Sequence, residues 1–186
     1  MDVGAVVVMA VLEVGTVTGP GCGDGLRSVI TAAMQGVVRE GTAQSLKNWL
    51  PPETAVAGKT GTTTEQRDAW FAGFTGDRLG IVWIGYDDNR AARLSGAGAA
   101  LPVWGEMMAA LAPEPLALPK PDGIENVLID PESGLRADFA CSGAVELPFV
   151  QGSAPAEPAP CASALGVAVE GVKQQAKSWM QRLFGR

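Results

Sequence analysis

The residues best suited to chemistry lie in one short stretch, Ala57-Gly58-Lys59-Thr60-Gly61-Thr62-Thr63. A lysine followed by hydroxyl-bearing residues presents a cation and hydrogen-bond donors, which together recognise a carboxylate or a phosphate. Gly61 has no side chain, so a ligand can lie close along the backbone at that position. The triplet Lys-Thr-Gly also occurs by chance where a surface lysine lies in a turn. The neighbouring sequence is needed to distinguish the two interpretations.

A phosphate-binding P-loop is the first function to test, because that motif also ends in Gly-Lys-Thr. The pattern GxxxxGK[ST] requires a further glycine at position 53, where this chain has Glu53. The β-branched residues Thr54 and Val56 stiffen the segment that would have to wrap the phosphates, and the Glu53 carboxylate would repel them. The sequence therefore excludes a P-loop.

The amino-acid composition excludes several further classes of catalytic and binding site. The 186 residues contain no His, which removes Ser-His-Asp and Cys-His nucleophile systems and most zinc sites. Fourteen Lys and Arg against twenty Asp and Glu give a net charge of -6, which argues against nucleic acid as a partner. We expect no metal and no cofactor, and the 47% hydrophobic content predicts a sizeable core.

The three cysteines, Cys22, Cys141 and Cys161, have neither CxxC nor metal-knuckle spacing. Cys141 and Cys161 close a short Pro-rich loop and would form a disulfide in an oxidising compartment. Three separate thiols are the alternative. Cys22 is left without a partner in either case.

Periodicity predicts the elements that must position the lysine. A helix is expected from Gly25, with Asp24 as its N-cap, Gly41 as its stop and one apolar face. That face comprises Leu26, Val29, Ile30, Ala33, Met34 and Val37. A strand is expected over 54–62, a hairpin over 69–75 and 79–86, and a helix over 101–111. Both faces of the hairpin strands are apolar, so helices should cover the sheet on both sides.

Composition also suggests a division of the chain. We expect an atypical leading segment (1–23), a main part (24–112), a Pro-rich linker with a small β appendage (113–164) and an amphipathic tail helix (165–186). Within the third part, 151–164 is low in complexity and is expected to be mobile. The apolar run of the leading segment is too short to cross a bilayer and lacks the basic start of a secretory signal.

The ordered series of motifs resembles the transpeptidase domain of class A, bifunctional penicillin-binding proteins. The matching pieces are KTGTT at 59–63, Asp68-x-Trp70-Phe71-x-Gly73, Val82-Trp83-x-Gly85-x-Asp87 and Gly98-x-x-x-Pro102-x-Trp104. The segment around Cys141, Asp138-Phe139-Ala140-Cys141-Ser142-Gly143, is similar to the C-terminal extension of the 1B branch. The resemblance covers about residues 24–150.

This resemblance implies an α+β fold: the C-terminal portion of a serine β-lactamase-like transpeptidase domain, with an antiparallel sheet covered by helices, a small appendage and a tail helix. It implies a D,D-transpeptidase that cross-links peptidoglycan stem peptides and reacts with β-lactams. Lys59 and Thr60 would hold the substrate carboxylate, and Gly61 would leave room for the acyl donor. Thr62 would offer its hydroxyl to that carboxylate and its backbone N–H to the oxyanion.

The chain departs from that family at the nucleophile. No Ser in the sequence is followed by Lys three residues later, and no Ser-x-Asn occurs. The Ser-x-x-Lys and Ser-x-Asn boxes are therefore absent, no catalytic side chain is assigned, and we expect the chain to be inactive by itself.

Three functional hypotheses remain at this point. The first is a C-terminal piece of a transpeptidase from a truncated or split gene, whose parent lies on the periplasmic side of the inner membrane. Its partners would be the missing N-terminal part or other cell-wall synthesis proteins. The second is a non-catalytic module that binds stem peptides or a synthase, and the third is an unrelated β-rich domain with a chance KTG. The predicted sheet lacks a first strand, so we expect aggregation unless residues 1–20 supply one.

Overall fold

The computed structural model describes residues 6–13, 24–117 and 121–162, and the chain divides into two compact units, Met1–Pro119 and Lys120–Arg186. The predicted tail helix over 165–186, Cys22 and most of the predicted leading segment lie outside the described residues.

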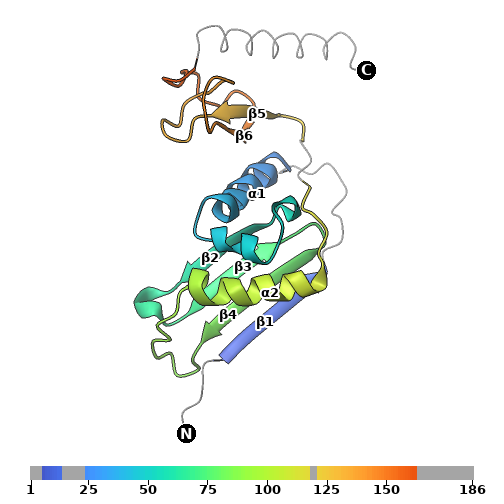
Figure 1. Ribbon diagram of the computed structural model, residues 1–186, viewed down its shortest axis with the longest axis vertical. Helices are drawn as coiled ribbons and strands as arrows, with labels where there is room; N and C mark the ends of the chain where they lie inside the picture. Colours follow the sequence, from blue (N-terminus) through green and yellow to red (C-terminus); the bar gives the residue numbers. More distant parts are fainter. Residues whose placement is uncertain (1–5, 14–23, 118–120, 163–186) are drawn as a thin grey trace. The chain divides into compact units, whose positions relative to one another are not determined.

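Unit 1 is built on a four-stranded antiparallel sheet with the strand order β1-β4-β3-β2 (Figure 1). Its strands are β1 (Val6–Glu13), β2 (Ala57–Thr62), β3 (Ala69–Phe74) and β4 (Arg78–Gly85). The β3–β4 hairpin follows the sequence expectation closely. β2 begins later than predicted, because Pro52–Thr54 form a 3-10 turn (η2) and Ala55 then adopts the left-handed conformation with φ 52°.

Part of the leading segment supplies the strand that the sheet needed. β1 pairs with β4 along its whole length, from Val6 opposite Gly85 to Glu13 opposite Arg78. At that last pair the Arg78 guanidinium forms an ion pair with Glu13 and lies 3.3 Å from Asp77. The hydrogen bond to Glu13 raises the pKa of Arg78.

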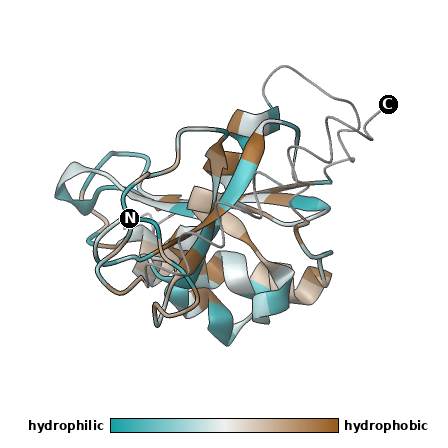
Figure 2. Cartoon of the chain, turned by 90° about the horizontal axis from the view of Figure 1, so that it is seen from above, coloured by the Kyte–Doolittle hydropathy of each residue, from teal (hydrophilic) through white to brown (hydrophobic). Residues whose placement is uncertain are grey.

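One face of the sheet, the inner face, carries the hydrophobic core. Directly opposed residues share a face, so Phe71 and Val82 lie together there, and both are fully buried. Helix α2 (Leu101–Leu111) packs across them, with Pro102 in its first turn as expected (Figures 1 and 2). Its Trp104 is fully buried and donates a hydrogen bond to the Gly80 carbonyl at 2.9 Å.

The opposite face of the sheet, the open face, is also apolar and has less cover over β3 and β4 than the inner face has. It comprises Ala57, Lys59 and Gly61 of β2, Trp70, Ala72 and Phe74 of β3, and Leu79, Ile81 and Trp83 of β4, with Ala10 and Leu12 of β1. Trp70 remains 41% exposed and Ile81 36%. In the part of the chain that the structure describes, the helical elements that contact β3 and β4, α2 and η4, lie on the inner face.

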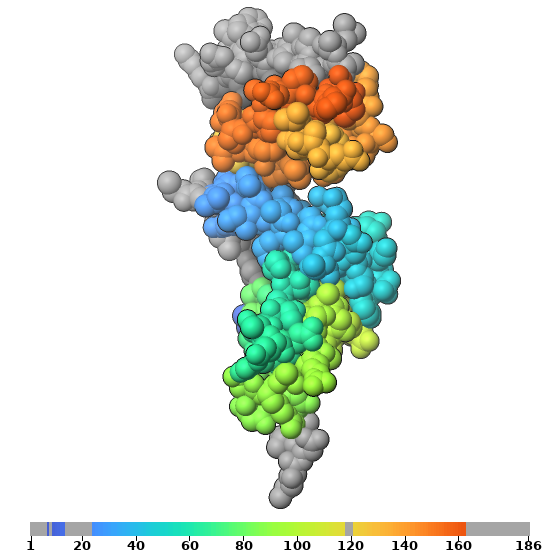
Figure 3. Space-filling model, turned by 90° about the vertical axis from the view of Figure 1, so that its left-hand side faces the viewer, coloured from blue at the N-terminus to red at the C-terminus, as the bar shows by residue number. Residues whose placement is uncertain are grey.

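Helix α1 (Asp24–Arg39) packs beside β2 and against the 3-10 helix η1 (Gln44–Asn48), and their surfaces are continuous in Figure 3. The helix begins at the predicted N-cap residue. Its buried residues are Ser28, Thr31 and Ala32. The expected apolar face is turned partly to solvent, since Leu26 is 63% and Ile30 51% exposed.

The Pro-rich stretch after α2 is attached to unit 1 where the structure describes it. Gly76 donates a backbone hydrogen bond to Glu114 at 2.9 Å, and Leu116 donates one to Thr54 at 3.0 Å. The predicted Pro-rich linker therefore included residues that belong to unit 1. Composition alone cannot show which backbone groups will form hydrogen bonds.

Unit 2 contains a second, two-stranded sheet of β5 (Ile124–Ile129) and β6 (Val145–Val150). A disulfide joins Cys141 to Cys161 beside a small cluster that includes Ala137 and Ala159. The sequence predicted a mobile, low-complexity segment over 151–164, of which the structure describes residues 151–162. Ala159 is buried, and the segment exchanges backbone hydrogen bonds with Arg136.

The small core of unit 2 makes its stability depend on the disulfide. The crosslink closes a loop with a sequence separation of 20 residues, which in the chain-entropy account stabilises by about 3 kcal/mol. We predict that Cys141→Ala with Cys161→Ala unfolds unit 2 at lower temperature and opens it to chymotrypsin at exposed Phe139. Ser142→Ala, which keeps the crosslink, should behave like the parent chain. Equal cleavage rates in the two variants would contradict the prediction.

Candidate functional site

The predicted site residues lie on β2, which forms one edge of the sheet. β2 pairs with β3 only, so its other edge has no strand partner among the described residues. Backbone N–H and C=O groups on such an edge can pair with an extended peptide. The candidate site therefore combines an unpaired strand edge with the side chains of Lys59, Thr60 and Thr62.

The alternation of the strand divides these residues between the two faces of the sheet. Lys59 and Gly61 lie opposite Ala72 and Trp70 and so belong to the open face. Thr60 and Thr62 belong to the inner face. The Lys59 side chain and the two threonine hydroxyls therefore leave the strand on opposite faces of the sheet.

The polar groups nevertheless meet around Thr60. The Lys59 ammonium donates a hydrogen bond to the Thr60 carbonyl at 2.7 Å, and the Thr60 hydroxyl lies 2.7 Å from that of Thr42. An ammonium has three donors, and two hydroxyls that share one hydrogen leave the other O–H free. Lys59 is exposed and has no ion-pair partner in the part of the chain that the structure describes. The site can therefore offer a cation and an O–H to an incoming anion.

Thr62 is held by the turn that precedes α2. Its hydroxyl accepts a hydrogen bond from the Gly96 N–H at 3.0 Å, at the start of the π-helical turn η4 (Gly96–Ala100). A Cβ on residue 96 would lie 2.5 Å from the Gly61 carbonyl, so only glycine permits this approach. The Thr62 O–H is still free to donate.

Asp68 fixes the turn that follows β2. One carboxylate oxygen accepts a hydrogen bond from the Trp83 indole at 3.0 Å, and the other accepts one from the Thr63 hydroxyl at 3.1 Å. The Asp68 N–H also donates to that hydroxyl at 2.8 Å. The sequence motifs contained Asp68 but gave it no role, and they did not include Thr42 or Gly96. Each of these residues acts through a partner at least five residues away, which a local motif does not reveal.

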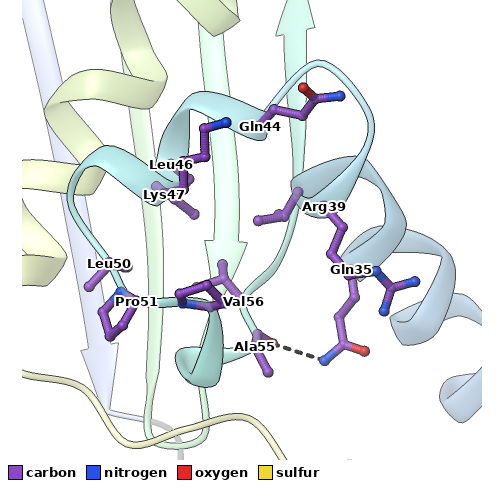
Figure 4. Close-up of a pocket in the computed structure, with 11 residues that line it drawn as sticks. Gln35, Arg39, Gln44, Leu46, Lys47, Leu50, Pro51, Ala55 and Val56 are labelled. Carbon is purple, nitrogen blue, oxygen red and sulfur yellow. Dashed lines mark hydrogen bonds between the residues drawn. The ribbon is translucent and has the colours of Figure 1, made fainter.

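A separate cavity of about 360 Å³ lies between α1, η1 and η2 (Figure 4). Leu46, Leu50 and Val56 contribute buried apolar side chains, and Gln35 donates a hydrogen bond to the Ala55 carbonyl at 2.9 Å. None of its lining residues belongs to 59–62. The cavity is therefore not part of the candidate site.

Within the described residues, no group of three or more His, Cys, Asp or Glu side chains is placed to hold a metal ion. Over the same residues, no helix has the length and apolar character needed to cross a membrane. The chemistry that the site offers comes from Lys59, the threonine hydroxyls and the strand edge.

Comparison with known proteins gives several sequence relatives. The chain is 41% identical over 121 residues to penicillin-binding protein 1B of Vibrio cholerae, which is 64% of this chain and 15% of that protein. It is 37% identical over 114 residues to penicillin-binding protein 1B of Escherichia coli, 61% of this chain and 13% of that protein. No protein-family model matches. The chain thus spans only a small part of each of these relatives.

A structural relative supports the same grouping. The crystal structure of penicillin-binding protein 1A from Haemophilus influenzae matches 72% of this chain with a TM-score of 0.62 and 27% sequence identity, and the match covers 21% of that chain. These findings confirm the resemblance found in the sequence and the predicted α+β fold class.

The close contact at Gly96 yields a direct test of the site's geometry. We predict that Gly96→Ala lowers the stability of unit 1 by about 1–3 kcal/mol, because the new methyl group would overlap the β2 and β3 backbones. Gly36→Ala is the matched control, since a Cβ there meets nothing within 4 Å and alanine favours the helix. Thermal unfolding followed by tryptophan fluorescence measures both. A Gly96→Ala variant as stable as Gly36→Ala would refute the contact.

Proposed function

We propose that this chain, a relative of the class A penicillin-binding proteins over about 60% of its length, is the C-terminal part of a peptidoglycan transpeptidase and binds the carboxylate of a stem peptide. The observation that carries the proposal is the convergence of the Lys59 ammonium and the Thr60 hydroxyl at an unpaired strand edge. The sequence similarity to proteins named for penicillin binding supports it.

Lys59 and Thr60 would recognise the negative end of the substrate. The ammonium has two donors left after its bond to the Thr60 carbonyl, and a charge-assisted hydrogen bond is stronger than a neutral one. A carboxylate at this point would also accept the free O–H of the Thr42–Thr60 pair. The same contacts would hold the carboxylate of a β-lactam.

Gly61 and Thr62 would position the bond that reacts. An extended acyl donor could pair with the free edge of β2, and the missing side chain of Gly61 leaves space above the strand. The Thr62 N–H would then donate to the oxyanion that forms when the acyl carbon is attacked. The Gly96 N–H holds the Thr62 hydroxyl and so limits movement of the strand at this point.

The attacking serine would come from outside this chain. No Ser here has the Ser-x-x-Lys spacing, and the chain spans 13–15% of two of its curated relatives. We infer that the chain contributes one wall of an active site and that the remaining part of such a protein contributes the nucleophile. The disulfide of unit 2 fits an oxidising compartment, which supports the periplasmic side of the inner membrane as the location.

A chimera tests this function with the missing part present. Residues 24–162 of this chain, which keep the Cys141–Cys161 disulfide, would replace the corresponding segment of V. cholerae penicillin-binding protein 1B, and covalent acylation by a fluorescent penicillin would be measured. We predict that the chimera is acylated and that Lys59→Ala lowers the second-order rate by about 10–100-fold, the loss of a charge-assisted hydrogen bond. Lys47→Ala removes another exposed lysine, away from β2, and should leave the rate unchanged. A Lys59→Ala chimera that reacts at the parent rate would overturn the proposal.

The isolated chain gives a complementary test. After incubation with a penicillin in non-reducing buffer, intact-mass analysis should detect no covalent adduct, because no serine has a lysine partner at the required spacing. An adduct on a single serine in stoichiometric yield would show that the chain has its own nucleophile.

A further inference from the structure

The cavity between α1, η1 and η2 lies within unit 1 and has no part in the carboxylate site (Figure 4). Its volume of about 360 Å³ falls in the range of small-molecule sites in proteins. The buried side chains of Leu46, Leu50 and Val56 contribute to its apolar lining. These side chains belong to the same hydrophobic core as Trp104, so packing holds them in place and the cavity is preformed.

Positively charged side chains also line this cavity. Arg39 comes from the last turn of α1 and Lys47 from η1, and both are exposed. Arg39 forms a long ion pair with Glu40, at 3.9 Å, and exposed pairs of this kind contribute little. Lys47 has no ion pair in the part of the chain that the structure describes. No Asp or Glu is among the described lining residues, although the whole chain has a net charge of -6. The cavity is therefore a locally positive site on an acidic chain.

The end of α1 could have favoured a cation instead, because carbonyl groups at the end of a helix carry partial negative charge. The carbonyls of Gly36 and Val37 accept backbone hydrogen bonds, at 2.9 and 3.1 Å. The Glu40 carbonyl accepts one from the side-chain amide of Gln44. Since these acceptors already have donors, the charge that a ligand meets comes mainly from the two cationic side chains.

We propose that this cavity, the α1 cavity, binds a small amphiphilic anion, a monocarboxylate with a single aliphatic chain. The chain would fill the space lined by Leu46, Leu50 and Val56, where it leaves water. The carboxylate would remain at the exposed side, where Arg39 and Lys47 supply positive charge and hydrogen-bond donors. The inference goes beyond the proposed function, because none of residues 59–62 lines the cavity.

Titration of the full 186-residue chain with three probes of equal chain length tests both parts of the proposal. Octanoate, octanol and octylammonium share the apolar body and differ in charge. Binding would be followed by the backbone amide signals of a ¹⁵N-labelled chain in two-dimensional NMR. We expect saturable shifts at Val38, Leu46 and Val56, with octanoate binding about tenfold or more tightly than octylammonium and octanol in between.

Matched variants separate the role of charge from that of shape. Arg39→Ala and Lys47→Ala should each weaken octanoate binding about threefold to tenfold and leave octanol binding unchanged, a pattern that a loss of structure would not give. Arg27→Ala is the control, because Arg27 is an exposed arginine earlier on the same helix and does not line the cavity. Val38→Phe places a larger side chain in the cavity and should weaken binding of octanoate and octanol alike. Circular dichroism would verify the fold of each variant.

Three outcomes would overturn the proposal: no saturable shifts with octanoate, equal affinity for octylammonium, or octanoate binding that Arg39→Ala and Lys47→Ala leave unchanged. Lys59→Ala distinguishes the α1 cavity from the carboxylate site on β2. If Lys59→Ala removes the octanoate shifts, the anion binds at β2 and the proposal is wrong. Penicillin acylation of the chimera does not depend on the cavity, so either result there leaves the α1 cavity to be judged by these titrations.

Discussion

The packing of Trp104 against a pair of glycines is the contact on which unit 1 depends. Gly73 and Gly80 lie opposite each other on β3 and β4, and a Cβ on Gly80 would lie 2.5 Å from the indole nitrogen of Trp104. The two glycines let α2 approach the sheet closely enough for that nitrogen to bond to the Gly80 carbonyl. The Phe71 ring packs edge-to-face against the Trp104 ring, with the ring centroids 5.1 Å apart. Once α2 is fixed in this way, η4 is fixed too, and through Gly96 it holds Thr62.

The same sheet also determines how the site is exposed. Alternation of side chains puts every second residue of β2 toward the core and the others toward the open face. Thr62 thereby lies on the side of the sheet that α2 and η4 cover, and Lys59 lies on the opposite side. A ligand that contacts both would connect the packed side of the sheet with the open side. This arrangement gives the strand a hydroxyl held by η4 and an exposed cation on the opposite side.

Local patterns in the sequence predicted the local elements well and the long-range ones poorly. The β3–β4 hairpin and α2 could be predicted because turn residues, β-branched runs and Pro102 act over a few positions. The beginning of β2 was placed too early, since the left-handed Ala55 has no signature of its own. The buried face of α1, which includes Ser28 and Thr31, could not be inferred from hydrophobicity. The contacts of Thr62 with Gly96 and of Thr42 with Thr60 join segments at least 18 residues apart, which periodicity does not report.

The β1 strand has a consequence for the behaviour of the chain in concentrated solution. Its sequence, VVVMAVLE, has no lysine or proline, and natural edge strands commonly use these residues to discourage pairing with another chain. Met9 is 53% and Leu12 60% exposed, and the outer edge of β1 has no strand partner among the described residues. Two copies could therefore pair through their β1 edges. The monomeric fraction would then fall by mass action as the protein concentration rises. The tendency of the protein to stay in solution would then depend on its local concentration as well as on its fold.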